Sequence, residues 1–245
     1  MSGAADPYLI PGTDVLRNKL GITDRKTLEE VESDLSTVRI GQYEPDPDTT
    51  MQGTVEELQR IHGYVFQDIY DWAGEIRTVD IHKSGGMPFQ PLEMFRNGAV
   101  YAEETLRNDN LLRGMDHDRF IDRLAVNYDN FNVLHPFREG NGRTQRLFWS
   151  LMADQAGWQL DWTKTTAGQI AWTSKQAMER GDYRPLKYMF DEISEPSPER
   201  FRTIEPGSEQ GLGPAALQLE HLPGPAFEDP WENPGIHAPG PGMGL

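Results

Sequence analysis

Apolar residues recur every three to four positions along most of the first 195 residues, which is the spacing of helices that bury one face. Between residues 54 and 70, for example, Leu58, Ile61, Val65 and Ile69 form one stripe. The same spacing predicts helices over residues 24–38, 54–70, 92–107, 117–134, 142–155, 166–180 and 183–192. The sequence therefore predicts an all-α domain without internal repeats.

One short segment has the residues of a β-hairpin instead. Residues 75–90, EIRTVDIHKSGGMPFQ, place β-branched side chains before a Ser84-Gly85-Gly86 turn. An isolated two-stranded hairpin is only marginally stable, so something else must use it. From the pattern alone, an ordinary surface hairpin is the simplest interpretation.

The helical pattern ends near residue 195. Residues 196–245 contain ten of the 18 prolines and eight glycines, above the roughly 25–30% of Pro and Gly that marks low-complexity chain. Two basic and seven acidic residues give this segment a net charge of −5. We therefore expect a domain over residues 1–195 and a disordered, acidic C-terminal tail over residues 196–245. Residues 214–222, PAALQLEHL, could form a short helix on a partner.

Composition narrows the class of protein further. The net charge of −16 disfavours direct binding to nucleic acid, because the phosphate backbone would repel the chain. Without cysteine there is no disulfide framework. No 18-residue apolar run and no signal-peptide pattern are present, so we expect a soluble, cytoplasmic protein that does not enter a membrane. Delivery by a secretion system that reads other signals stays open.

The residues best suited to chemistry are concentrated in HPFREGNGRTQR, residues 135–146, between the fourth and fifth predicted helices. Unpaired N–H groups and the helix dipole make the start of a helix a site for anions. Gly140 and Gly142 let the backbone approach a phosphate closely, and the Asn141 amide can donate to a phosphoryl oxygen. The segment thus predicts a phosphate site at the start of the fifth helix.

Side chains of the same segment complete a site for a nucleoside triphosphate. At about 100° per residue, Arg143 and Arg146 lie about 60° apart on one helix face, so both can reach one polyphosphate. Glu139 is one carboxylate, and Mg²⁺ needs only one or two besides the phosphates. His135 can act as a general base near neutral pH. A helix-capping loop with incidental charge is the alternative, which the complete set disfavours.

These residues match the motif of the Fic family, HPFx[D/E]GNGRxxR, at every fixed position. The resemblance extends to residues 6–24, DPYLIPGTDVLRNKLGITD, and residues 61–81, IHGYVFQDIYDWAGEIRTVDI. Together the similarity covers roughly residues 6–193. It implies a Fic-type helical domain, with the residue 75–90 segment as a β-hairpin flap beside the active site.

The resemblance implies a protein adenylyltransferase, which moves AMP from ATP to a Ser, Thr or Tyr hydroxyl of a target protein. His135 would deprotonate the hydroxyl, and Glu139 would hold Mg²⁺ or Mn²⁺ on the phosphates. Gly142 favours AMP transfer, because kinase-like relatives carry lysine there. The implied phosphate-binding set is Gly140, Asn141, Gly142, Arg143 and Arg146.

The resemblance also implies how the target docks. The flap of the family pairs with the target's backbone by strand addition. On this chain the implied docking residues are Val79, Asp80, Ile81, His82 and Lys83. The histidine of the second helix, His62, lies in an apolar stripe, and we expect it to be packed without a chemical role.

Many Fic proteins carry an inhibitory helix with the motif [ST]xxxE[GN], whose glutamate pairs with the second motif arginine, here Arg146. No Ser or Thr of this chain is followed four positions later by Glu. We therefore expect inhibition by a separate small antitoxin, as in the toxin–antitoxin branch of the family, with bacterial type II topoisomerase as a candidate target. Transfer of another nucleotide or phosphate-containing group, and a weakly catalytic protein-binding module, are the alternatives.

Overall fold

The structure is a computed structural model that describes residues 6–46, 50–82 and 86–198. In these residues it contains seven α-helices and two 3₁₀ turns, so the predicted all-α class is confirmed. The 3₁₀ turns span Asn110–Leu112 and Trp162–Lys164. The helices are α1 (Arg25–Gly41), α2 (Val55–Phe66), α3 (Leu92–Asn108), α4 (His117–Leu134), α5 (Asn141–Gln155), α6 (Ala167–Arg180) and α7 (Arg184–Ile193).

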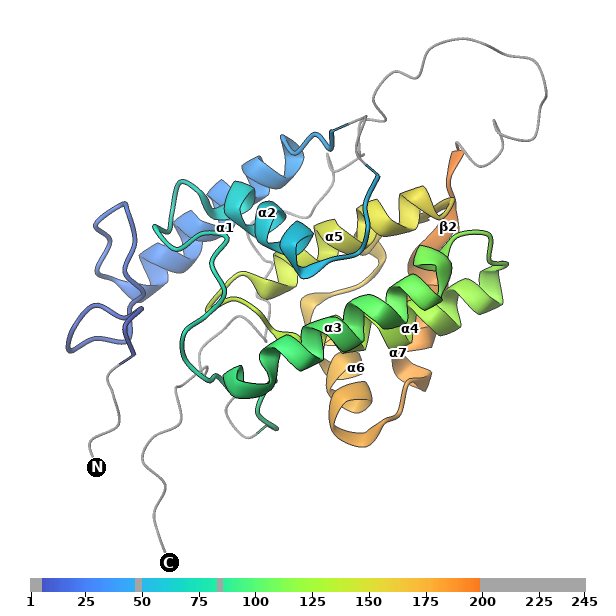
Figure 1. Cartoon of the computed structure of the whole chain (residues 1–245). Coiled ribbons are helices and arrows are strands. Elements are labelled where there is room, and N and C mark those ends of the chain that lie inside the picture. Colours follow the sequence, from blue (N-terminus) through green and yellow to red (C-terminus); the bar gives the residue numbers. More distant parts are fainter. Residues whose placement is uncertain (1–5, 47–49, 83–85, 199–245) are drawn as a thin grey trace, which may run out of the picture.

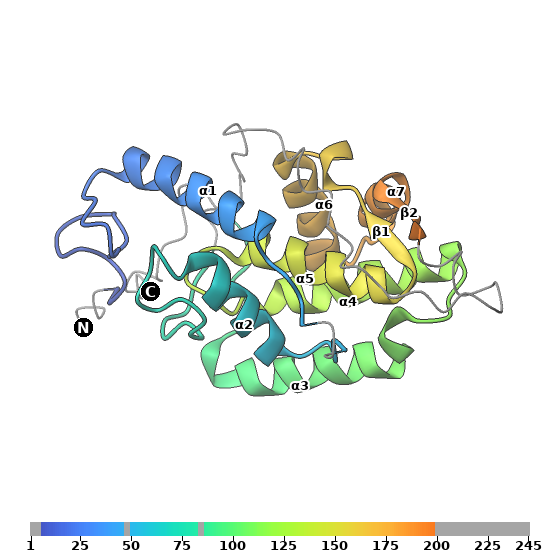
Figure 2. The same cartoon turned by 90° about the horizontal axis from the view of Figure 1, so that it is seen from above.

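The helix α5 runs through the middle of the molecule, with α1 and α2 on one side and α4, α6 and α7 on the other (Figures 1 and 2). Its side chains Phe148, Trp149 and Met152 are completely buried. Phe131 of α4 packs edge-on against Trp149, with ring centroids 5.6 Å apart. Most of the core thus surrounds α5. This packing fixes the position of the first turn of α5, where the predicted motif ends.

Local capping explains where the helices begin. The Thr54 hydroxyl and the Glu57 carboxylate form a reciprocal capping box at the start of α2. Asp116 caps α4, whose bounds agree with the prediction at both ends. The helix α2 ends at Phe66, four residues earlier than predicted, and the amides of Ile69 and Tyr70 both donate to the Phe66 carbonyl in the turn that follows.

The strands lie elsewhere than predicted. The two named strands of the described residues are β1 (Trp158–Leu160) and β2 (Ser194–Pro196), which pair antiparallel. We expected strand only between residues 75 and 90, and that was wrong, because three-residue strands are too short to leave a pattern in the sequence. In the described part of the predicted flap, His82 and Pro88 form an isolated antiparallel bridge, and the Phe89 amide donates to the Ile81 carbonyl at 3.3 Å. Because β2 crosses the expected domain boundary after residue 195, the described fold continues to residue 198, and the predicted disorder of residues 199–245 lies outside the described residues.

No helix in the described part of the chain is long and apolar enough to span a membrane. Several acidic residues are buried in the helical domain, and Asp129 is the one whose pKa is raised most clearly. Asp129 of α4 is 5% exposed, and its Oδ2 accepts a hydrogen bond of 3.0 Å from the Tyr183 hydroxyl. Loss of hydration outweighs this hydrogen bond and raises the pKa of Asp129 to about 6.

The raised pKa predicts a pH-dependent stability. The protonated Asp129 carboxyl suits the core, so its contribution is complete below the ordinary pKa of 3.8 and is lost as the pH rises through about 6. We expect Asp129→Asn to raise the free energy of unfolding at pH 7 by on the order of 2 kcal/mol and to change it little at pH 4. Urea unfolding at both pH values measures this, with the exposed Asp118→Asn of the same helix as the control. Equal effects of Asp129→Asn at the two pH values would contradict the prediction.

Candidate active site

The loop between α4 and α5 begins and ends with a left-handed residue. His135 follows α4 with φ 42° and ψ 65°, and Gly140 precedes α5 with φ 79°. Within the loop, the Asn141 side chain accepts a hydrogen bond from the Phe137 amide (2.9 Å) and donates one to the Phe137 carbonyl (2.8 Å). The amide predicted to contact an anion therefore holds the loop closed in this structure, and Phe137 is fully buried beneath it.

Gly140 is required by contact as well as by conformation. A Cβ atom placed on it would lie 2.4 Å from the ring of Phe66, which no real contact allows. Phe66 is itself completely buried, so its ring has no room to move away. The aromatic ring of α2 thus brings the backbone of the motif loop close to the body of the domain.

Glu139 lies at the start of α5, as the motif predicts. The residue is 8% exposed, and its carboxylate accepts a hydrogen bond from the Gly140 amide and lies 3.8 Å from Arg143. Among the described residues no group of three side chains could hold a metal ion by itself. A single buried carboxylate at a helix N-terminus does fit a divalent ion that takes its other ligands from a bound phosphate chain and water.

The first motif arginine, Arg143, is held by residues of α1 and α2. Arg143 forms an ion pair with Glu32 of α1 and donates to the Ser36 hydroxyl at 2.9 Å, and its guanidinium lies 4.9 Å from the Phe66 ring. The Tyr70 hydroxyl donates to the other oxygen of Glu32. Sequence reasoning missed this network, because nothing in the pattern of α1 marks Glu32 as a partner for a residue 111 positions later.

His135 lies in a defined setting at the end of α4. Its ring stacks face to face on Phe89, with centroids 3.6 Å apart and an interplanar angle of 10°. Its Nδ1 lies 3.3 Å from the Asn132 carbonyl. Because a carbonyl can only accept, this contact favours the tautomer with a proton on Nδ1 and none on Nε2, which is the form that a general base needs.

A second histidine supports the motif loop from α2. His62 is completely buried, its Nε2 donates to the Glu139 carbonyl (3.0 Å), and its Nδ1 accepts from the Gly74 amide (2.8 Å). Its ring stacks on Phe137 at 3.9 Å. Burial lowers the pKa of His62 to about 3, so it stays neutral at physiological pH. The prediction of a packed histidine was right, but its support of the loop left no signal in the sequence.

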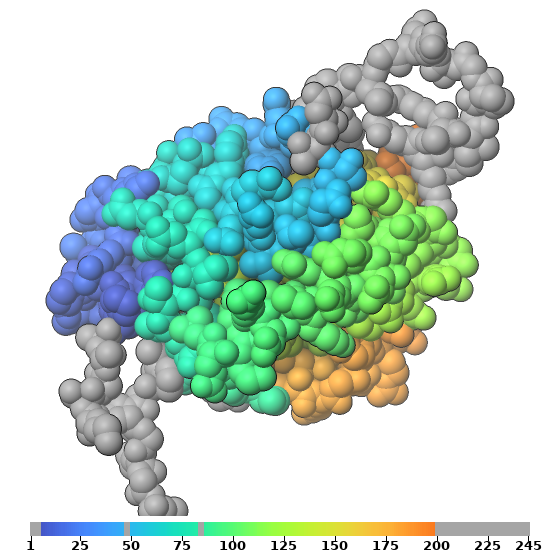
Figure 3. Space-filling model, viewed as in Figure 1, coloured from blue at the N-terminus to red at the C-terminus, as the bar shows by residue number. Residues whose placement is uncertain are grey.

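The N-terminal segment also fastens the loop. Asp6 forms a buried ion pair with Arg138 at 3.0 Å. The Thr78 amide donates to the Tyr8 hydroxyl (3.0 Å), which ties the same segment to the base of the flap. Figure 3 shows the N-terminal segment in blue lying against the teal segment that follows α2. Resemblance to the family pointed to this segment, but residue pattern alone did not.

The predicted flap residues have unequal environments. Ile81 is 1% exposed and Val79 packs against the core, so these two side chains face inward. Asp80 accepts from the Leu92 amide at 2.8 Å, and His82 takes part in the bridge to Pro88. Lys83 lies outside the described residues. On the returning arm, the Met87 amide donates to Glu179 of α6 at 3.1 Å, so the loop is tied to the helical body.

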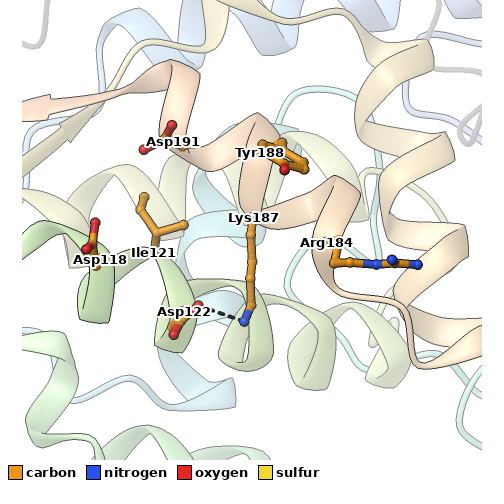
Figure 4. A pocket seen from close by; sticks show the side chains of 7 residues that line it. All are labelled: Asp118, Ile121, Asp122, Arg184, Lys187, Tyr188 and Asp191. Carbon is orange, nitrogen blue, oxygen red and sulfur yellow. Dashed lines mark ion pairs between the residues drawn. The ribbon is translucent and has the colours of Figure 1, made fainter.

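A separate cavity of about 320 Å³ lies between the first half of α4 and α7. Figure 4 shows Lys187 directed toward Asp122, and the two form an ion pair at 2.6 Å. No residue of the motif lines this cavity, so the candidate active site is the loop before α5. The cavity is lined by Asp118, Ile121, Asp122, Arg184, Lys187, Tyr188 and Asp191.

Comparison with known proteins agrees with this assignment. The Fic/DOC family profile matches residues 52–153, from the start of α2 almost to the end of α5. The chain is 35% identical to the "Probable protein adenylyltransferase Fic" of Escherichia coli (strain K12), over 77% of this chain and 92% of that one. It is 37% identical to the protein adenylyltransferase VbhT of Bartonella schoenbuchensis, over 66% of this chain and 34% of that longer protein.

A solved structure extends the likeness to three dimensions. The BepC protein of Bartonella tribocorum, crystallised with AMPPNP, has a TM-score of 0.74 and 27% identity, over 78% of this chain and 97% of that one. The chain belongs to the Fic/DOC family. Both the predicted family and the predicted class of enzyme, a Fic protein adenylyltransferase, are thereby confirmed.

The contact between Gly140 and Phe66 makes a testable prediction. Gly140→Ala should cost about 3 kcal/mol of stability, because it adds a steric overlap to an unfavourable left-handed backbone. Gly114→Ala is the matched control, since Gly114 has a similar φ of 72° but open space around it. That variant should lose only about 1–2 kcal/mol. Urea unfolding of both variants measures the difference, and equal losses would show that Phe66 does not restrict the loop.

Proposed function

We propose that this protein transfers AMP from ATP to the hydroxyl of a Ser, Thr or Tyr residue on a target protein. The observation that carries the proposal is the hydrogen-bond contact of His135. Its Nδ1 lies against the Asn132 carbonyl, which favours an unprotonated Nε2 in the loop that precedes the N-terminus of α5. A base at one end of the motif loop and a helix N-terminus at its other end suit transfer from a nucleotide to a hydroxyl.

In the proposed mechanism, His135 Nε2 takes the proton of the target hydroxyl. The hydroxyl oxygen forms a bond to the α-phosphorus of ATP, the bond from that phosphorus to the bridging oxygen breaks, and pyrophosphate leaves. Backbone N–H groups at Gly140, Asn141 and Gly142 and the guanidinium of Arg146 would bind the phosphates. Mg²⁺ or Mn²⁺, when bound with Glu139 as its protein ligand, neutralises phosphate charge.

Arg143 has two roles in this proposal. Its ion pair with Glu32 and its hydrogen bond to Ser36 already direct the guanidinium toward α1. A phosphate that reached Arg143 would have to compete with a buried carboxylate. We therefore propose that Arg143 positions the first turn of α5 as well as binding phosphate, and that Arg143 and Arg146 together bind the β- and γ-phosphates.

A direct test uses labelled ATP and the base. ATP labelled at the α-phosphate should mark acceptor proteins, and ATP labelled at the γ-phosphate should not, because Gly142 leaves room for the α-phosphate to face the acceptor. His135→Ala should lower transfer about 10²–10⁴-fold and leave ATP affinity nearly unchanged. His117→Ala, at the far end of α4, is the control and should transfer normally. Labelling from γ-labelled ATP, or full activity of His135→Ala, would refute the mechanism.

We make further proposals about the inhibitor, the target and the extent of the catalytic domain. We propose that the enzyme is a toxin silenced by a small antitoxin, with bacterial type II topoisomerase as the target. The support is the sequence, in which no Ser or Thr stands four positions before a Glu. Glu32 does not fulfil that motif, since Leu28 stands where the Ser or Thr would be. We propose also that the catalytic domain ends with β2 and that the acidic tail beyond it is not needed for transfer.

Co-expression tests the antitoxin proposal. The free protein, given ATP, Mg²⁺ and topoisomerase, should transfer AMP and slow bacterial growth. A small partner bearing [ST]xxxE[GN] should suppress both effects, because its glutamate would pair with Arg146 in place of the γ-phosphate. Exchange of that glutamate for glycine should restore transfer while the complex still forms. A free protein that stays inactive under these conditions would mean that no separate inhibitor is needed.

A further inference from the structure

Arg77, at the base of the flap, is a buried guanidinium outside the motif. The residue is 2% exposed and its side chain is completely buried. Removal of such a charge from water is costly unless its donors are satisfied, and loss of hydration lowers the pKa of Arg77. The carboxylate of Asp80 lies 3.4 Å away and is 52% exposed. Most of the stabilisation of this cation therefore has to come from other groups.

Backbone carbonyls supply that stabilisation, and they come from both sides of the active site. Arg77 Nη1 donates to the Val79 carbonyl on the outgoing arm of the flap (2.8 Å). Arg77 Nη2 donates to the Gln90 carbonyl on the returning arm. Arg77 Nε donates to the carbonyl of His135 itself at 2.8 Å. The Arg77 amide adds a hydrogen bond of 2.8 Å to the Pro136 carbonyl. One planar group thus joins the two arms of the flap to the residue that carries the base.

This connection bears on the geometry of the imidazole. His135 has a left-handed backbone, which is unfavourable for any residue with a Cβ and persists only where its surroundings enforce it. The Arg77 guanidinium donates to the carbonyls on both sides of the His135 Cα, that of Leu134 at 3.5 Å and that of His135 at 2.8 Å. The returning arm of the flap supplies Phe89, which stacks on the imidazole, and the Gln90 amide donates to the Val133 carbonyl at 2.9 Å. Backbone and ring of His135 are therefore both fixed from the flap.

We propose that Arg77 is a positioning residue for the transfer reaction: it joins the flap backbone at Val79 and Gln90 to His135, so that a target hydroxyl docked beside these residues meets Nε2. The inference rests on the function proposed above. A buried charge is weak evidence for a purely stabilising role, because the cost of desolvation offsets much of what its contacts contribute. The guanidinium has donors on three separate nitrogens, and each of them meets a different carbonyl, whereas the three donors of a lysine share one nitrogen.

Steady-state kinetics of the full chain test the proposal. Arg77→Gln should lower kcat for AMP transfer about 10–100-fold, because a misplaced base loses the geometry of attack. The KM for ATP should stay within about threefold, since the phosphate-binding groups are untouched. Arg77→Lys should recover part of kcat. Arg39→Gln is the matched control, because it removes a guanidinium that forms two hydrogen bonds with Asp68 and none with the motif loop.

A second readout does not depend on activity. In the nucleotide-free protein, the ¹⁵N resonances of the His135 ring should report one tautomer, with the proton on Nδ1, and Arg77→Gln should convert this to a mixture. An unchanged tautomer together with wild-type kcat, or a loss confined to the KM for ATP, would overturn the proposal. If Arg77→Gln does not fold, Arg77→Lys is judged by the same two measurements. A wild-type protein that transfers no AMP would refute the proposed function, and the tautomer would still test Arg77.

Discussion

The active site depends on the hydrogen bonds that close the loop between α4 and α5 from outside. Its buried carbonyls at His135, Pro136 and Glu139 are met by donors of Arg77 and His62, and Asn141 pairs with the backbone of Phe137. A buried carbonyl without a donor is costly, so each of these contacts is needed. Without them the left-handed residues at the two ends of the loop would relax, and His135 would move away from the N-terminus of α5.

The helices could be predicted because their signals are local. The stripe of Leu58, Ile61, Val65 and Ile69 and the capping residues lie within a few positions of the turns they specify. The motif likewise placed His135 directly after α4 and Glu139 just before α5, because the two helical patterns end and begin at those positions. Fold class and loop position therefore followed from the sequence, and comparison with relatives added the class of enzyme.

The remaining features depend on pairs that are far apart in the chain. His62 donates a hydrogen bond to the carbonyl of Glu139, 77 positions later. Arg143 donates one to the carboxylate of Glu32, 111 positions earlier. A histidine in an apolar stripe has the same pattern whether or not it donates to a catalytic loop. The strands β1 and β2 could not be predicted from the sequence pattern either. Each is three residues long and forms only when the two segments pair. Tertiary contacts decide such features, and a single sequence does not encode them in its periodicity.

The pairing of β1 with β2 fixes where the chain leaves the domain. The strand β1 follows the C-terminal end of α5, and the Ser197 amide donates to the Gly157 carbonyl at 3.0 Å, so the described chain ends beside that end of the helix. The motif lies at the opposite end of the same 15-residue helix, on the order of 20 Å away along its axis. A fluorophore or fused reporter attached just after β2 would thus be separated from the reacting groups by the length of the central helix.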